Sequence, residues 1–180
     1  MNKLDLIDIN KIIIHTAAAE KATTVDDIKQ WHLDKGWSDI GYHFVITGSN
    51  YDLEKGRIYK GRDLWKKGAH AKFCNNSIGI CLTGHGDLYP FTKRQEHLLS
   101  GLLQMILKEY PYQFSIDQII GHRDTWWEKL KRNKTCPGTT NSILDVKRNL
   151  VLTNMTDFDP IEEAKIKKWL PKAEKWIGLK

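Results

Sequence analysis

The segment SIGICLTG, residues 77–84, indicates the fold class of this chain. Apolar residues run through it without the alternation of a half-exposed strand, which predicts a central strand buried on both faces. Four other short runs rich in β-branched or aromatic residues predict its neighbours: KIIIHT (11–16), YHFVIT (42–47), GRIY (57–60) and QII (118–120). The sequence therefore predicts a sheet that must be covered by helices.

Helical patterns alternate with these strands. The longest, residues 92–110, has Thr92 and Gln95 as a capping pair and places its leucines on one face. Residues 24–36 and a segment beginning near Thr140 show similar spacing. The alternation predicts an α/β fold in a single domain, with a central mixed β-sheet flanked by helices.

The composition changes after about residue 152, so we expect a main domain over residues 1–152 and a basic amphipathic helical extension over residues 153–180. A helix begins at Pro160, and Pro171 must bend or break it. Two interpretations stay open: the extension packs on the domain, or it contacts an anionic envelope surface. The side expected to be apolar consists of Ile161, Ala164, Trp169, Leu170, Ala173, Trp176 and Ile177.

The composition is that of a globular protein with a basic surface. The chain has 180 residues, 41% of them hydrophobic, and a net charge of +6, which favours attraction to polyanions such as nucleic acid, anionic lipid or cell-wall polymers. Asp5 and Asp8 interrupt the amino terminus, so we expect no signal peptide and synthesis in a cytoplasm. We expect a monomer with no membrane span and, with three cysteines, no disulfide framework.

One stretch, GHRDTWWEKLKRNKTCPG (121–138), permits two interpretations. Its bases and tryptophans fit a nucleic-acid patch, whereas His122 and Cys136 fit half of a metal site. His15, like His122, follows a predicted strand, at the edge where side chains can converge on a cleft. Two imidazoles and a thiolate suit catalytic zinc, with the fourth position left for water. Spacing alone does not decide, because a strand-end histidine or a lone cysteine is often structural.

Five blocks resemble, in order, the zinc-dependent N-acetylmuramoyl-L-alanine amidases of the type-2 family. They are IIIHT, GWSDIGYHFVI, GRDLWKKGAHA, NNSIGICLTG and GHRD…KTCPG, within residues 11–150. The chain looks most like the small phage lysozymes that are amidases, and it is similar to peptidoglycan recognition proteins. The resemblance implies a mixed sheet, one zinc ion, and hydrolysis of the amide that joins lactyl-muramic acid to L-alanine in bacterial peptidoglycan. It makes residues 1–152 the catalytic domain.

The same resemblance assigns site residues by position. It implies zinc ligation by His15, His122 and Cys136, with Tyr42 and Lys134 as catalytic residues that hold no metal. It suggests substrate contacts for His70, Asn76 and Arg62. His43 is expected to be structural because it follows Tyr42 on a strand and so points to the other face. Cys81 is expected in the core and Cys74 as a free thiol.

Three other functions were weighed. A non-catalytic peptidoglycan-binding module is disfavoured because such family members typically lose the cysteine ligand that this chain keeps at 136. A nucleic-acid-binding protein is disfavoured because no RNP, KH or helix-turn-helix signature accompanies the basic stretch. A cytosolic amidase that recycles muropeptides would resemble relatives with aspartate as the third ligand. The expected function is therefore a phage endolysin that reaches the wall without a signal peptide of its own.

Overall fold

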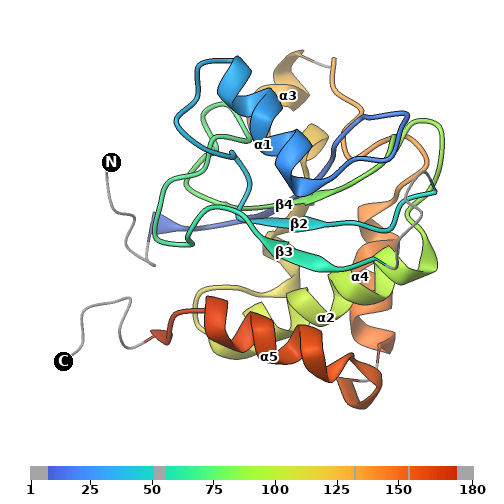
Figure 1. Ribbon diagram of the computed structural model, residues 1–180. Helices are drawn as coiled ribbons and strands as arrows, with labels where there is room; N and C mark the ends of the chain where they lie inside the picture. The colour runs from blue at the N-terminus through green and yellow to red at the C-terminus, as the bar shows by residue number, and fades with distance from the viewer. Residues whose placement is uncertain (1–7, 51–55, 132, 154, 174–180) are drawn as a thin grey trace.

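A computed structural model describes residues 8–50, 56–131, 133–153 and 155–173. Its centre is one mixed sheet in the order β3-β2-β4-β1-β5 (Figure 1). The strands are β1 (Ile12–Thr16), β2 (Phe44–Ile46), β3 (Ile58–Lys60), β4 (Ile78–Leu82) and β5 (Ile119–Gly121). Only β3 pairs antiparallel with its neighbour, and the other pairs are parallel. The predicted α/β class and mixed sheet are confirmed, and β4 is central and buried along its whole length.

Helices cover both faces of the sheet (Figure 1). On one face lie α1 (Val25–Asp34) and α3 (Trp126–Lys131), and on the other lie α2 (Lys93–Glu109), α4 (Ile143–Leu152) and α5 (Pro160–Trp169). The described residues also contain the short 3-10 helices η2 (Ile116–Gln118), η3 (His122–Asp124) and η4 (Met155–Asp157). The capping boxes predicted at Thr24 and Thr92 are present. Helix α3 was not predicted.

Strand alternation divides the interior into two layers. Ile12 and Ile14 pack in the large cluster with α2, whereas Ile13 packs in a small cluster on the other face. His15 continues the side of Ile13, because side chains two apart along a strand share a face. It is paired in register with Cys81 of β4, which packs in a cluster with Ile28 of α1, so the two side chains lie next to each other on the face that α1 covers.

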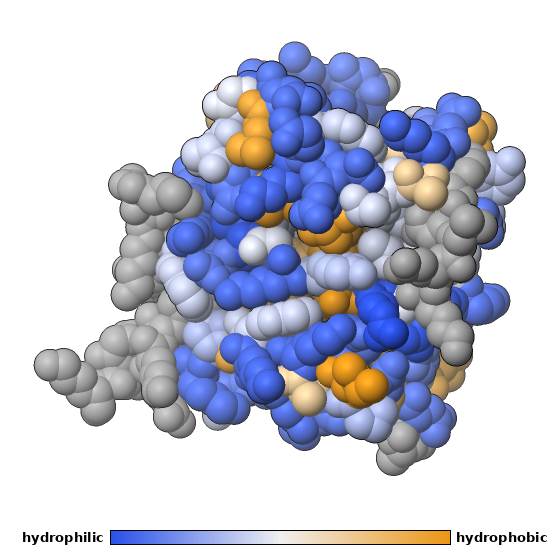
Figure 2. All heavy atoms as spheres, viewed as in Figure 1, coloured by the Kyte–Doolittle hydropathy of each residue, from blue (hydrophilic) through white to orange (hydrophobic). Residues whose placement is uncertain are grey.

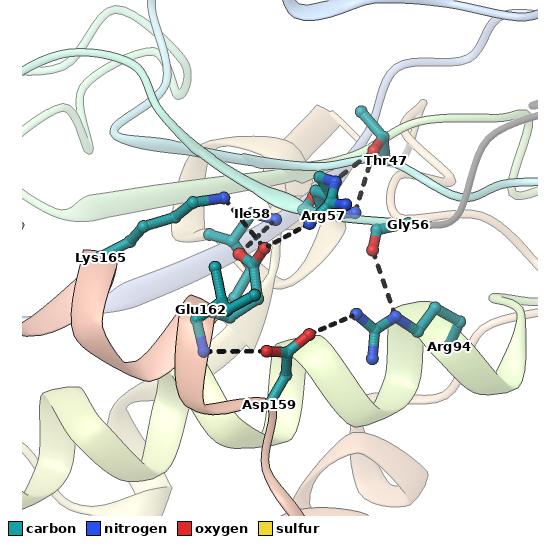
Figure 3. Close-up of polar contacts among 9 residues, drawn as sticks. Thr47, Gly56, Arg57, Ile58, Arg94, Asp159, Glu162 and Lys165 are labelled. Atoms are coloured by element: carbon teal, nitrogen blue, oxygen red, sulfur yellow. Dashed lines mark hydrogen bonds and ion pairs between the residues drawn. The ribbon is translucent and has the colours of Figure 1, made fainter.

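Helix α5 is fixed to the edge strand β3 by a buried carboxylate (Figure 3). Glu162 is 0% exposed and accepts a 3.1 Å hydrogen bond from the backbone N–H of Ile58. Arg57 and Lys165 pair with the same carboxylate at 3.5 and 3.0 Å. The buried carboxylate thus accepts a hydrogen bond from a backbone N–H of the edge strand, and the two cations balance its negative charge.

The described part of the extension packs on the domain. Phe158, Ile166 and Leu170 belong to the main core cluster, and the helix ends before Pro171 as predicted. The predicted apolar side is wrong at Ile161, which is 61% exposed, and at Ala164, which is also exposed, because Glu162 and Ile166 face the domain instead. Trp176 and Ile177 lie outside the described residues.

The surface in the same view is mostly hydrophilic, with small separate hydrophobic patches (Figure 2). Within the described ranges, every helix is too short or too polar to cross a bilayer.

Candidate metal centre and active site

The first predicted ligand, His15, lies at the carboxyl end of β1 and is buried. Its Nε2 atom is 3.0 Å from Nδ1 of His70, and its Nδ1 atom is 3.8 Å from Sγ of Cys136. The backbone N–H of the next residue, Thr16, donates to the same sulfur at 3.4 Å. The end of the strand therefore places both an imidazole and a backbone donor against the cysteine.

The other two ligands come from a loop that Arg123 holds together. His122 opens η3 directly after β5, and Cys136 follows fourteen positions later. The backbone N–H of Arg123 donates to the Cys136 carbonyl at 2.7 Å, and its guanidinium donates to the carbonyls of Thr135 and Gly138 at 3.0 and 2.6 Å. This side chain was not singled out by sequence reasoning, and it fixes Cys136 relative to His122.

Two glycines let this loop approach the sheet closely. Gly138 has a φ of 112°, and a Cβ there would lie 2.0 Å from the backbone of Gly86, in the segment after β4. Asp87 adds hydrogen bonds from Thr135 and from the N–H of Thr139, both at 2.8 Å. The Cys136 loop is thus held against the end of the central strand.

The donor atoms of His15, His122 and Cys136 all lie within 4.8 Å of one another. Two imidazoles and one thiol are a donor set that zinc accepts, with bonds of about 2.0–2.3 Å, so a small closure around an ion would complete the site. Burial, with the neighbouring histidines as a smaller cause, holds the pKa of His15 well below its usual value. Burial also lowers the pKa of His122. Both rings are therefore neutral near pH 7, as metal ligation requires.

His70 determines the tautomer of His15. Nε2 of His70 lies 3.2 Å from the carbonyl oxygen of Ser77, which can only accept, so Nε2 carries the proton. Nδ1 of His70 then accepts from Nε2 of His15, which leaves the lone pair of His15 Nδ1 facing Cys136. This assignment follows from the hydrogen-bond network. The His70 ring fits because Gly79 and Gly68 have no side chains: a Cβ on either would lie 2.5 Å from it.

Glu128, on α3, is a second partner that sequence reasoning missed. Its carboxylate is buried, and Oε1 lies 3.7 Å from Nε2 of His122. That nitrogen is buried and has no hydrogen-bond partner within the described residues. A carboxylate beside the outer nitrogen of a ligating histidine is the common way in which proteins orient such a ring.

Tyr42 lies beside the candidate ligand cluster of His15, His122 and Cys136. Its ring centroid is 5.1 Å from that of His15 and 5.3 Å from that of His32. Burial, followed by the neighbouring cysteines, raises the pKa of Tyr42 well above its usual value. The phenol therefore keeps its proton and can act as a donor.

Lys134 is exposed at the rim of the site. Its positive charge is near enough to lower the pKa of both His122 and Cys136. Burial has the larger effect on the thiol and raises the pKa of Cys136 to about 11. Lys134 thus adds a cation beside the cluster from the solvent side.

Each of the three residues predicted to contact substrate lies in a different part of the structure. His70 is buried behind His15 with both ring nitrogens engaged. Arg62 is buried and donates to the backbone carbonyls of Ile40, Lys67 and Asp39. Asn76 precedes β4 and donates to the Asp8 carbonyl, at the opposite end of the sheet from His15. Five residues of strand, roughly 16 Å, separate Asn76 from the level of the cluster. The structure brings none of the three side chains into the open part of the site.

His43 is structural as predicted, but the stated reason is wrong. Strand β2 begins at Phe44, so alternation does not apply to positions 42 and 43. Nδ1 of His43 accepts from the Gly79 N–H at 3.0 Å, and Nε2 lies 3.0 Å from the Lys66 carbonyl. Cys81 is buried as predicted.

Comparison with known proteins agrees with this geometry. The family model for N-acetylmuramoyl-L-alanine amidase matches residues 5–139. The endolysin of Enterobacteria phage T3 is 35% identical over 138 residues, which cover 66% of this chain and 85% of that protein. The endolysin of Escherichia phage T7 is 38% identical over 107 residues. These residues cover 55% of this chain and 67% of the T7 protein.

Solved structures show the same fold. The N-acetylmuramoyl-L-alanine amidase LysC from Clostridium intestinale superposes with a TM-score of 0.66 at 27% identity, over 81% of this chain and 87% of that one. The match in sequence spans three quarters of the chain and includes every residue of the candidate cluster. The chain therefore belongs to the N-acetylmuramoyl-L-alanine amidase family.

Proposed function

We propose that this amidase is an endolysin that hydrolyses the amide bond between N-acetylmuramic acid and L-alanine in bacterial peptidoglycan, with zinc held by His15, His122 and Cys136. The observation that carries the proposal is the convergence of these three donors at the carboxyl edge of the sheet. The names of the similar phage proteins and of the solved amidase support the choice of substrate.

The residues around the cluster fit a zinc ion better than they fit a structural role. Zinc bound there would polarise the scissile carbonyl and lower the pKa of water toward about 7. His70 fixes the tautomer of His15, and Glu128 is placed to orient His122. Such outer partners typically change metal affinity or activity by about 10–100-fold when they are removed.

Tyr42 and Lys134 provide the groups that act on the substrate. The protonated phenol of Tyr42 can donate to the leaving amine or hold the attacking water. The ammonium of Lys134, exposed beside Cys136, can stabilise the negative oxygen that develops at the carbonyl. The two groups approach from different sides, since Tyr42 comes from the segment before β2 and Lys134 from the loop after α3.

Mass spectrometry of muropeptides released from purified peptidoglycan tests this function. We expect glycan strands that lack peptides, together with free peptides that begin with L-alanine, and we expect a chelator to suppress both and added zinc to restore them. Cleavage within the peptide or between sugars would contradict the proposal.

A further inference from the structure

Three aromatic side chains form a partly exposed cluster where α3 meets the segment before β4. Phe73 is 60% exposed and Trp126 is 56% exposed, although both are large apolar side chains. Their ring centroids are 5.8 Å apart, and Trp127 lies 4.7 Å from Phe73 and 5.6 Å from Trp126. We name Phe73, Trp126 and Trp127 the aromatic ledge. The basic, aromatic stretch that was ambiguous in the sequence supplies two of its three rings.

The ledge is held in place by specific contacts. The ammonium of Lys72 lies 5.3 and 5.1 Å from the ring centroids of Phe73 and Trp127, and that of Lys131 lies 4.8 Å from Trp127. These are attractive cation–π distances.

Phe73 also has an unusual backbone conformation. Its φ is 60°, in the left-handed region that a bulky residue rarely adopts. Backbone strain of this kind is unfavourable and is concentrated at functional sites. The strain and the exposure together mean that the fold presents this ring to solvent at a cost in stability.

The ledge adjoins the metal cluster through both of its segments. Glu128 directly follows Trp127 and reaches to 3.7 Å from His122. On the other side, the segment that carries Phe73 begins at His70, which is 3.0 Å from His15. Each segment of the ledge is therefore within three residues of a group that contacts a ligand histidine.

We propose that the aromatic ledge binds N-acetylated sugar rings of the glycan strand and so extends the amidase site along the polymer. The inference rests on the proposed function, because the scissile amide is attached to a sugar and any productive complex brings that sugar close to the metal cluster. A pyranose ring presents a face of C–H groups that packs on an exposed aromatic ring, and N-acetyl sugars carry no charge that must be desolvated.

The test is titration of the zinc-loaded protein with an N-acetylglucosamine tetramer, followed by tryptophan fluorescence. This probe has the sugar rings but no peptide and no scissile amide, so it reports on the ledge even if the proposed amidase function fails. We expect saturable binding in the wild type that weakens about tenfold in Phe73→Gly and in Trp126→Ala. Trp126→Phe should retain part of it, and Tyr112→Ala, an exposed aromatic outside the ledge, should retain all of it.

Controls separate a binding defect from misfolding. Phe73→Gly suits a left-handed backbone and removes the ring, so its melting temperature should be no lower than that of the wild type and its zinc content should be unchanged. Its KM for polymeric peptidoglycan should rise more than its KM for a single-sugar muropeptide. Unchanged tetramer binding in both ledge variants would overturn the proposal. Loss of binding to anionic vesicles or to an oligonucleotide, with tetramer binding intact, would overturn it in favour of a lipid or a nucleic acid.

Discussion

At the residue scale, the active site depends on neutral side chains held in one protonation state. Tyr42 is partly buried and its pKa is raised, and His15 is buried and its pKa is lowered, so neither carries a charge near pH 7. Lys134 is the charged group and lies at the exposed rim. In the proposed mechanism, Tyr42 would donate a proton inside the site and Lys134 would stabilise negative charge at its mouth.

Tyr42→Phe should keep its zinc and its melting temperature while losing roughly 10²-fold or more in the rate of amide hydrolysis, because only the hydroxyl is removed. Tyr59→Phe, on the edge strand β3, is the matched control and should hydrolyse at the wild-type rate. Rates on a soluble muropeptide measure both. A Tyr42→Phe variant as fast as the control would remove Tyr42 from the chemistry.

His43 should make the fold sensitive to acid. Burial lowers its pKa from the ordinary 6.5 to about 4, so the unfolded chain binds a proton that the folded chain does not. Its contribution to stability is complete above pH 6.5 and is lost as the pH falls toward 4, at up to about 1.4 kcal/mol per pH unit.

Urea unfolding in the presence of chelator, at several pH values from 7 to 4.5, measures this effect without a contribution from zinc. His43→Gln should show a shallower loss of stability than the wild type, and His97→Gln, on α2, should follow the wild type. Equal slopes for all three proteins would mean that His43 is not the acid-sensitive group.

At the scale of elements, the carboxylate of Glu162 connects α5 to β3. Removing one partner of a buried ion pair leaves other polar groups unsatisfied, here the Ile58 N–H. Glu162→Ala should therefore lower the free energy of unfolding by about 2–4 kcal/mol. Glu163→Ala removes a more exposed pair with Lys167 and should cost less than about 1 kcal/mol. Urea midpoints that shift equally in both variants would contradict this difference.

The sequence predicted the strands and helices whose patterns lie within one short stretch of the chain. Strand β4 was identified by its continuous apolar run, and α2 by its cap and its leucines. The burial of Glu162 could not be predicted, because its partners Arg57 and Ile58 are more than a hundred positions away in the chain. Helix α3 was missed because six residues carry little periodicity and their packing beside His122 is tertiary.

In the candidate site, too, some residues could be predicted from local patterns and others could not. His15, His122 and Cys136 were identified from strand ends and motif order, and the structure brings them together. The partners Glu128 and Arg123 have no local signature, since each acts through a contact made only in the folded chain. The motif that contains His70 placed it near the site, but only the folded chain shows that it lies behind His15.

At the scale of the whole molecule, the family match ends at residue 139, yet the core continues beyond it. Phe158 packs over Gly101 of α2, where a Cβ would lie 2.1 Å from its ring. Ile166 and Leu170 are buried in the same cluster. These contacts favour an extension that is part of the fold over a detachable cationic tail.

Truncation after Thr153 should therefore destabilise the protein strongly. Loss of three large buried side chains removes about 5–9 kcal/mol of apolar burial, which is comparable to the total stability of a typical domain. We expect a truncated chain that precipitates or melts many degrees lower, as measured by thermal denaturation. A truncated protein that melts near the full-length temperature and digests purified peptidoglycan normally would instead support the tail interpretation.

The measurement that tests the central claim most directly is the zinc content of purified protein after dialysis against a weak chelator. We predict about one zinc per chain in the wild type, a large loss in His15→Ala and in Cys136→Ala, and full retention in Cys74→Ala, which removes a thiol outside the cluster. Full zinc occupancy in Cys136→Ala, with the fold intact, would contradict the assignment of the metal centre.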